Sequence, residues 1–346
     1  MFNIMKNWWK IAIAMIVSGT VLFGLSFALG ARGGYAYVDG GGLKFSSASE
    51  AAAQASKISL EPFETVDVDV SSADIEFVAS DGYGIEYRLP AFADAPEWNV
   101  AGGKLTVRTP SNGFYWTFMD FGFQRHYVKV YFPRGGASFG SVSITTKSGD
   151  IVLAELPAGD VSLKTNSGTV KADVLGYKRA TAQTSSGDIT FRGGGADGAA
   201  IKLSAMSGDI KADASGCASV DLETASGQIT LSGDTPPHAE LKAATKSGGI
   251  TVDASQWKSL AADATSGDVM ITGKPQGSTT AKAMSGNVTM AIRGEARDFS
   301  YDISAASGSV RVDGQRMGNS ARNANSGAKN TIDANTFSGN VSLDFN

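Results

Sequence analysis

The sequence predicts an all-β fold: a single-chain parallel β-helix, or β-solenoid, with rungs of about 20 residues, preceded by one N-terminal transmembrane helix. Three observations predict this fold. A Ser-Gly pair recurs at nearly constant spacing, apolar and polar residues alternate on both sides of each pair, and one uncharged apolar run lies near the N-terminus.

The first observation is the repeated Ser-Gly pair. Its serines are Ser148, Ser167, Ser186, Ser207, Ser226, Ser247, Ser266, Ser285, Ser307 and Ser338. The first nine are separated by 19, 19, 21, 19, 21, 19, 19 and 22 residues, and the longer last step contains a further Ser326-Gly327. Because glycine adopts positive φ at little cost and serine hydrogen-bonds nearby backbone, each pair predicts a sharp corner.

The second observation is the alternation around each corner. Three residues after the serine every repeat has Ile or Val, from Ile151 to Val341, and two before it every repeat has Thr or Ala, from Thr146 to Thr336. The positions between these columns are mostly polar. Period two on both sides of a corner predicts two short strands with one face inward, and stacking the repeats buries that face. The small inward residues predict a narrow interior.

The sequence leaves the length of one coil open. Lys171-Ala172-Asp173 and Lys211-Ala212-Asp213 follow alternate serines, so a weaker period of about 40 residues accompanies the shorter one. The pattern also extends upstream to Ser72, where Ala73 replaces the glycine. We therefore assign residues 57–135 to an N-terminal β segment and residues 136–346 to the Ser-Gly repeat solenoid.

The third observation, the uncharged run over residues 11–30, predicts a transmembrane helix. Twenty helical residues rise about 30 Å, the thickness of the hydrocarbon core of a bilayer. Lys6 and Lys10 precede the run, so the positive-inside rule places residues 1–10 in the cytoplasm. A cleaved signal peptide is the alternative, with Ala28-Leu29-Gly30 as its cleavage site.

Both alternatives place the rest of the chain outside the cytoplasm. Residues 31–56 are rich in Gly, Ala and Ser, which predicts a flexible linker. We expect a single-pass protein of the cell membrane, with a cytoplasmic N-terminus and an extracytoplasmic C-terminal domain.

The composition excludes several function classes. The net charge of −4 provides no basic field for binding nucleic acid. The single cysteine, Cys217, excludes an internal disulfide framework and a multi-cysteine metal site. His126 and His238 are far apart, and the sequence has no zinc-protease, serine-hydrolase or P-loop motif. We predict that the chain is not an enzyme, and we assign it no catalytic residue, no metal and no cofactor.

Two columns of aspartates accompany the corners. The first, two residues after the serine, contains Asp150, Asp188, Asp209 and Asp268. Calcium-binding β-rolls place aspartates similarly, but other repeats carry Thr, Gln, Gly, Asn or Ser here, which favours polar turn residues. The second column, six residues after the serine, contains Asp173, Asp213, Asp253, Asp313 and Asp344. Lys171, Lys211 and Arg311 precede three of these, which predicts solvated charge pairs; the alternative is a groove of paired carboxylates.

The N-terminal β segment contains a dense aromatic cluster. Its members are Phe114, Tyr115, Trp116, Phe118, Phe121 and Phe123. One interpretation is a cap over the open end of the solenoid, because terminal rungs need protection from edge pairing. The other is a patch that contacts membrane, glycan or a partner protein, which makes these six residues the candidate partner-binding site.

The corner motifs resemble a known family. The Ser-Gly-Asp-Ile sequences at residues 148–151, 186–189 and 207–210 are similar to the bacterial DUF4097 or "putative adhesin" β-strand repeat family, as are residues 128–133 and 330–346. The resemblance covers residues 57–346. It implies a surface-exposed β-helical protein, often with an N-terminal membrane anchor, and some relatives are associated with envelope stress. It offers no catalytic residues to transfer.

The sequence supports three hypotheses about function. The leading one is a non-catalytic, membrane-anchored protein of the cell envelope, adhesin-like or envelope-stress-associated, that binds cell-wall polymer or an envelope protein. The second is a carbohydrate-active β-helix enzyme that acts on cell-wall or extracellular glycan. The third is a structural spacer or self-assembling rod.

Overall fold

The computed structural model describes residues 18–19, 34–39, 42–47, 53–89, 95–109, 119–120 and 125–346. The chain divides into two units; the first takes in residues 1–53, 90–94 and 111–125, and the second takes in the rest. In the first unit an antiparallel sheet with the order β2–β1–β9 is formed by β1 (Gly34–Asp39), β2 (Gly42–Ser47) and β9 (Met119–Asp120).

The prediction of a flexible linker over residues 31–56 is corrected by this sheet. The strands β1 and β2 form an antiparallel hairpin that places Asp39 opposite Gly42. Tyr, Val, Leu and Phe residues in the two strands favour β structure more strongly than the surrounding glycines favour a flexible chain. The predicted transmembrane run over residues 11–30 lies outside the described residues, apart from Ser18 and Gly19. Within the described part of the chain, no helix is both long and apolar enough to cross a membrane.

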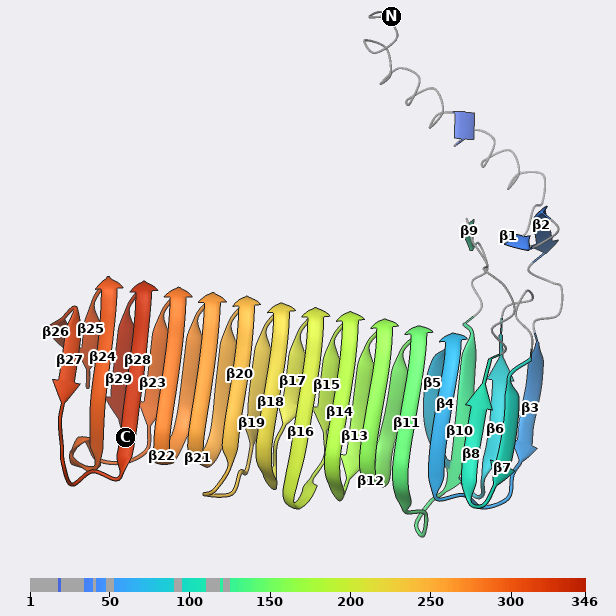
Figure 1. Ribbon diagram of the computed structural model, residues 1–346, viewed down its shortest axis with the longest axis horizontal. Helices are drawn as coiled ribbons and strands as arrows, with labels where there is room; N and C mark the ends of the chain where they lie inside the picture. The colour runs from blue at the N-terminus through green and yellow to red at the C-terminus, as the bar shows by residue number, and fades with distance from the viewer. Residues whose placement is uncertain are drawn as a thin grey trace, which may run out of the picture. The chain divides into compact units, whose positions relative to one another are not determined.

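The second unit is an all-β solenoid of stacked rungs (Figure 1). Its first strands are β3 (Gln54–Ser59), β4 (Thr65–Ser72), β5 (Asp74–Ser80), β6 (Gly84–Arg88), β7 (Glu97–Ala101), β8 (Lys104–Arg108) and β10 (Tyr127–Pro133). The regular array follows with β11 (Phe139–Ser148), β12 (Ile151–Ser167), β13 (Val170–Leu175), β14 (Tyr177–Ser186), β15 (Ile189–Arg192), β16 (Gly195–Ser207), β17 (Ile210–Asp213), β18 (Cys217–Ser226), β19 (Ile229–Gly233), β20 (Glu240–Ser247), β21 (Ile250–Ser266), β22 (Val269–Ser285) and β23 (Val288–Ile292). The final elements are the 3-10 helix η2 (Ala296–Asp298), β24 (Phe299–Ser307), β25 (Val310–Val312), β26 (Gln315–Gly318), β27 (Ser320–Asn323), β28 (Asn330–Ser338) and β29 (Val341–Phe345).

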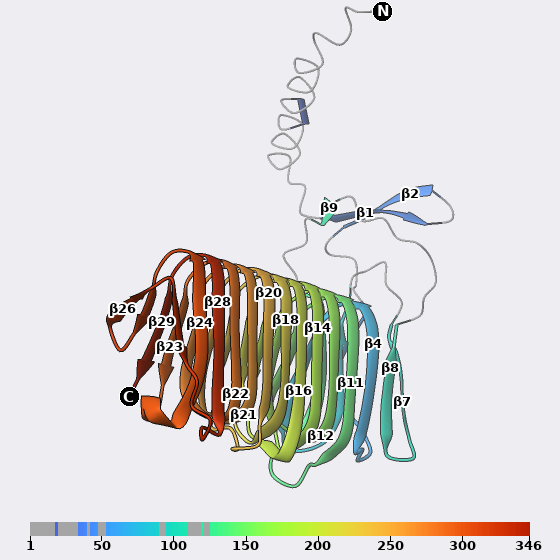
Figure 2. The ribbon, with the colours of Figure 1, turned by 60° about the vertical axis from the view of Figure 1, so that its left-hand side comes forward.

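The rungs, each named here by its corner serine, stack in parallel with corner on corner (Figure 2). Ser148 pairs with Ser167, and Ser167 pairs with Ser186. Each coil therefore contains one repeat, which settles the question that the sequence leaves open. The inward isoleucines stack as predicted, since Ile210 pairs with Ile189 on one side and Ile229 on the other.

The core is a narrow apolar column inside the stack. Inward Ile, Val, Leu and Ala side chains from every rung are buried, and a few larger ones fill the wider places. Tyr177 and Trp257 are the largest fully buried side chains, and each finds a polar partner. The hydroxyl of Tyr177 lies 3.1 Å from the Sγ atom of Cys217, and Nε1 of Trp257 donates to Oγ1 of Thr279 at 2.9 Å.

Close stacking explains why the corners need glycine. Gly168 has φ of 157°, and a Cβ atom there would lie 2.0 Å from the carbonyl oxygen of Gly149 on the preceding rung. At the Ser72 corner Ala73 replaces glycine; Ala73 is buried and its φ is not positive, so this corner does not use the backbone conformation of the glycine corners.

The two ends of the array depart from sequence order. At one end β4 and β5 lie inside β8 and β10, which follow them in the chain, and the antiparallel strands β7, β6 and β3 lie farther out. At the other end the Ser338 rung lies between the Ser285 and Ser307 rungs. The antiparallel strands β26 and β27 cover the outer side of the Ser307 rung. The sequence pattern predicts neither rearrangement.

Candidate functional site

A groove among the described residues crosses five rungs on the sheet before the corners; we call it the sheet groove. Its volume is about 370 Å³. One wall consists of outward residues three before the corner serine, including Gln183, Ser204, Glu223 and Asp263. The other wall consists of outward residues directly before the serine, including Ser185, Met206 and Lys246. The groove therefore presents hydroxyl, amide and charged groups of both signs along one line.

The floor of the sheet groove follows from the column of small inward residues. Thr184, Ala205, Thr224 and Thr245 occupy this position in successive rungs. Oγ1 of Thr184 donates to the Gly168 carbonyl at 3.2 Å, and Oγ1 of Thr224 donates to the Gly208 carbonyl at 3.1 Å. The hydroxyls are thus used by the corner of the neighbouring rung, and the rigid floor leaves only the wall groups for a ligand.

A line of ion pairs runs beside the groove on the same sheet. Asp221 lies between Lys202 and Lys242 of the neighbouring rungs, with N–O distances of 3.0 and 3.4 Å. Partial burial alone would raise the pKa of Asp221. The hydrogen bond from Lys202 and the positive charges of both lysines outweigh burial and hold the pKa below its usual value. Asp221 is shared by the two lysines, which leaves one net positive charge beside the groove. The charged residues that line the groove itself include Glu223, Lys246 and Asp263.

The corner aspartates form a ladder between rungs. The carboxylate of Asp150 accepts from the backbone N–H of Thr169 at 2.7 Å, and the carboxylate of Asp188 accepts from Asp209 N–H at 2.8 Å. Asp268 does the same for Asn287, at 2.7 Å. Each carboxylate binds the backbone of the next rung at the same position. In the described part of the chain, no group of three or more His, Cys, Asp or Glu residues is arranged to hold a metal ion.

The second aspartate column does not form the predicted pairs with Lys171, Lys211 and Arg311: the ion pairs of the described residues do not include them. Asp213 instead accepts hydrogen bonds from the N–H and hydroxyl of Ser215, at 3.0 and 2.6 Å. Asp313 accepts from Phe345 N–H at 2.9 Å. Two residues along a strand project side by side, but the backbone and hydroxyl donors of the bends lie closer to these carboxylates.

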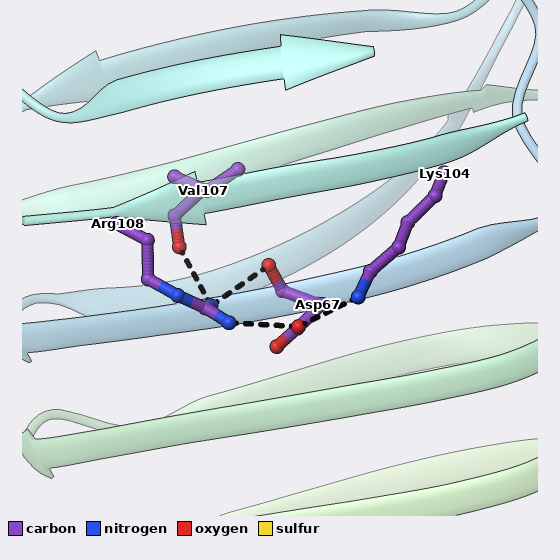
Figure 3. A network of polar contacts seen from close by, with 4 residues as sticks. All are labelled: Asp67, Lys104, Val107 and Arg108. Atoms are coloured by element: carbon purple, nitrogen blue, oxygen red, sulfur yellow. Dashed lines mark hydrogen bonds and ion pairs between the residues drawn. The ribbon is translucent and has the colours of Figure 1, made fainter. Parts of the chain in front are cut away.

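The candidate residues Phe114, Tyr115, Trp116, Phe118, Phe121 and Phe123 lie outside the described residues. The described strands near them in sequence carry two polar networks. In the first, shown in Figure 3, Asp67 on β4 binds Lys104 at 2.9 Å and Arg108 at 2.7 Å, both on β8. Hydrogen bonds from Arg108 and Lys104 outweigh partial burial and lower the pKa of Asp67. This network ties the outer strand β8 to the Ser72 rung.

The second network lies on the outward face of β6 and β10. The hydroxyls of Tyr127 and Tyr131 both donate to the carboxylate of Glu86, each at 2.7 Å. These two hydrogen bonds lower the pKa of Glu86. The ammonium groups of Lys57 and Lys129 lie over the rings of Tyr131 and Tyr127, at 4.5 and 4.7 Å from the ring centroids. Each polar group here already has a partner, so the network stabilises the pairing of β6 with β10.

The sheet groove was not predicted from the sequence. The sequence feature related to it is the column of Thr and Ala two residues before each serine. These small side chains point inward, so the outer surface is lower at this position than at the outward residues on either side. The sequence does not predict that the outward residues on either side form walls, because these residues vary in size and charge from rung to rung.

The chain was compared with protein families, curated sequences and solved structures. A family model described as Toastrack DUF4097 matches residues 63–235 and 199–344. No curated protein sequence matches the chain. Similar solved structures include a "putative adhesin" from Bacteroides fragilis, with 11% identity and a TM-score of 0.31, covering 83% of this chain and 95% of that one. A "putative lipid binding protein" from Parabacteroides distasonis has 13% identity and a TM-score of 0.39, with 83% and 95% coverage. A "putative cell adhesion protein" from Clostridium sporogenes has 12% identity and a TM-score of 0.18, with 84% and 98% coverage.

Proposed function

The chain belongs to the Toastrack DUF4097 family, and on that premise we propose that it is a non-catalytic scaffold of the bacterial cell envelope that binds a linear cell-wall polymer. In this proposal residues 11–30 anchor the chain in the cell membrane, with the N-terminus cytoplasmic and the solenoid outside. The uncharged run and the preceding Lys6 and Lys10 support this orientation.

The sheet groove is the observation that carries the proposal. It crosses five rungs, and parallel strands repeat about every 4.8 Å. Its walls therefore offer hydrogen-bonding groups at regular intervals, which suits an extended polymer with hydroxyl or amide groups along its length. Met206 lies exposed on one wall and adds a flexible apolar surface beside these polar groups. The rigid stack keeps these groups in place before binding, which lowers the entropy lost on association.

A blocked groove tests the proposal. Ala244→Trp places an indole between the walls of the sheet groove, and Thr251→Trp places the same group on the exposed sheet after the corner as a matched control. The full-length protein and both variants are sedimented with purified cell-wall polymer. We expect the Ala244→Trp variant to lose roughly tenfold or more in affinity, while the control binds as the natural chain does. Equal binding by all three proteins would remove the groove from the proposal.

A second experiment asks whether the partner is a polymer or a protein. The tethered chain is isolated from its native envelope with and without residues 114–123, the segment that contains the candidate aromatic cluster. A co-purified envelope protein that depends on this segment would support a protein partner. Release of soluble sugar fragments from the wall polymer would instead favour the carbohydrate-active enzyme, for which the groove offers the carboxylates of Glu223 and Asp263.

A further inference from the structure

The Ser338 rung fills a slot between two rungs that precede it in sequence. On one side β28 pairs with β22, with Ser338 opposite Ser285. On the other side it pairs with β24, with Ser338 opposite Ser307. Past the corner, β29 is likewise held between β23 and β25. Both walls of this slot are therefore formed by residues 269–312, without any contribution from the rung that occupies it.

Corner contacts fix the rung on both sides of the slot. On the Ser285 side, Asn340 N–H donates to Oδ1 of Asn287 at 2.9 Å, and Oγ1 of Thr336 donates to the Gly286 carbonyl at 2.7 Å. On the Ser307 side, Gly339 N–H donates to the Ser307 carbonyl at 3.1 Å. A rung with the same sequence from a second copy of the chain would make the same contacts in this slot.

The connection to the rung is short and exposed. Residues 324–329 join β27 to β28, and they contain no strand. Because β24 lies between β27 and β28, this connection must pass around the start of β24, where Asn325 exchanges hydrogen bonds with the Ser300 hydroxyl. The distance to be crossed is two strand spacings, roughly 9–10 Å, and six connecting residues, which make seven Cα–Cα steps, can span about 24 Å. The connection is thus long enough to close on its own slot, with roughly twice the reach that it needs.

We propose that residues 330–346 form an exchangeable rung, which leaves its own slot and occupies the slot of a second copy of the chain. The slot contacts are the same in the closed monomer and in the exchanged dimer, so the connection and the protein concentration decide between them. The closed form prevails in dilute solution because the rung is tethered beside its own slot. Crowding of copies, or strain in residues 324–329, favours the exchanged dimer.

A disulfide reporter tests the exchange in the full-length chain. Lys282 and Asn335 are paired outward residues on β22 and β28, and parallel neighbours at this spacing suit a disulfide. In a Lys282→Cys, Asn335→Cys variant the closed form gives an intramolecular disulfide, and the exchanged form gives a covalent dimer on a denaturing gel. Deleting residues 325–329 leaves one connecting residue, which spans about 7 Å and cannot reach the chain's own slot.

We expect the shortened variant to run mainly as a covalent dimer, and its unshortened parent to run mainly as a monomer at low concentration. A matched control inserts glycine and serine residues into the same connection and should remain monomeric. A shortened chain that stays monomeric, with its two new cysteines unlinked, would overturn the proposal.

A second measurement covers the case in which the shortened chain fails to fold. The chain is ended after Lys329 and mixed with a labelled peptide of residues 330–346. We expect the peptide to bind, and a Gly339→Val peptide to bind roughly tenfold more weakly or worse, because a Cβ at Gly339 would lie 2.1 Å from the Gly286 carbonyl oxygen. No binding would show that the Ser307 rung collapses onto the Ser285 rung, and equal binding of both peptides would show that the slot is not used; either result overturns the proposal.

Discussion

A Cβ atom added to Gly187 would lie 2.1 Å from the carbonyl oxygen of Gly168 on the neighbouring rung, whereas real Cβ atoms essentially never come closer than 3.0 Å to such atoms. The same relationship joins Gly208 to Gly187, at 2.0 Å. A side chain at either of these corners must therefore push two rungs apart and break the hydrogen bonds between them. The corner glycines are required by the backbone of the next rung as well as by their own positive φ.

We expect Gly187→Ala to lower the free energy of unfolding by about 3 kcal/mol or more, because it combines a backbone clash with unfavourable φ. Urea denaturation measures the effect. The matched control is Gly82→Ala, since a Cβ at Gly82 would meet no atom within 4 Å and its φ is not positive. Similar losses for the two variants would contradict this account of the corner.

The threonine floor allows a milder change. Thr224→Val keeps the side-chain volume but removes the hydrogen bond from Oγ1 to the Gly208 carbonyl. We expect a loss of about 1 kcal/mol in the free energy of unfolding, the usual contribution of one buried hydrogen bond. Thr251→Val, at an exposed position of the other sheet, should cost nothing measurable. If the two variants are equally stable, the hydrogen bond from the Thr224 hydroxyl contributes nothing to the free energy of unfolding.

Stability should fall in acid through Glu86. The hydrogen bonds from Tyr131 and Tyr127 lower the pKa of Glu86 below 4.5, its value in an unfolded chain. A lowered pKa contributes stability that is present above pH 4.5 and disappears as pH falls through the folded value. Glu86→Gln should therefore flatten the acid side of a plot of denaturation midpoint against pH. If the denaturation midpoint of this variant falls as steeply in acid as that of the natural chain, other carboxylates cause the loss of stability.

Stability should fall in alkali through Tyr131. Burial, followed by the hydrogen bond to Glu86, raises the pKa of Tyr131 from 10.0 to about 12. A raised pKa contributes stability that is fully present below pH 10.0 and is lost as the pH approaches 12. Tyr131→Phe should remove this part of the alkaline loss, which absorbance of tyrosinate during a pH titration measures independently. An unchanged titration would show that Tyr131 does not ionise in the folded protein over this range, which would contradict the prediction.

The rate at which a reagent labels the Cys217 thiol should measure how often the core of the solenoid opens. It is fully buried, it lies 3.1 Å from the Tyr177 hydroxyl, and burial raises its pKa, so little reactive thiolate is available. We expect a thiol reagent at pH 8 to label the folded protein only slowly, at the rate at which the core opens. Labelling should become rapid in denaturing urea. Fast labelling without denaturant would mean that the rungs around Cys217 separate easily.

The regular part of the fold could be predicted because its cause is local. Ile189, Ile210 and Ile229 stack as expected from a β-branched residue at constant distance from a glycine corner. The order of the last rungs could not be predicted in this way. Val288, Val310 and Val341 are interchangeable in size and shape, so periodicity cannot tell which of them are neighbours. The long step between Ser307 and Ser338 marks this part of the sequence as irregular, but it does not show where the last rung lies.

The candidate site was less accessible to sequence reasoning than the core. A groove depends on how outward side chains of different rungs combine, and Gln183, Glu223 and Asp263 share no pattern that marks them as one wall. The ladder of corner aspartates shows the same difficulty. An aspartate in a bend indicates a backbone hydrogen bond, but the sequence does not show that the acceptor reaches the next rung, as Asp150 reaches Thr169.

The uniform corners also bear on how the molecule changes in evolution. Unequal recombination between two copies of the Ser-Gly unit would add or remove one whole coil while leaving both specialised ends intact. Each new neighbour would still meet a glycine carbonyl and a β-branched residue at the same height. Length can therefore drift among descendants of this protein far more freely than sequence at the bends, and natural variants are expected to differ by whole units.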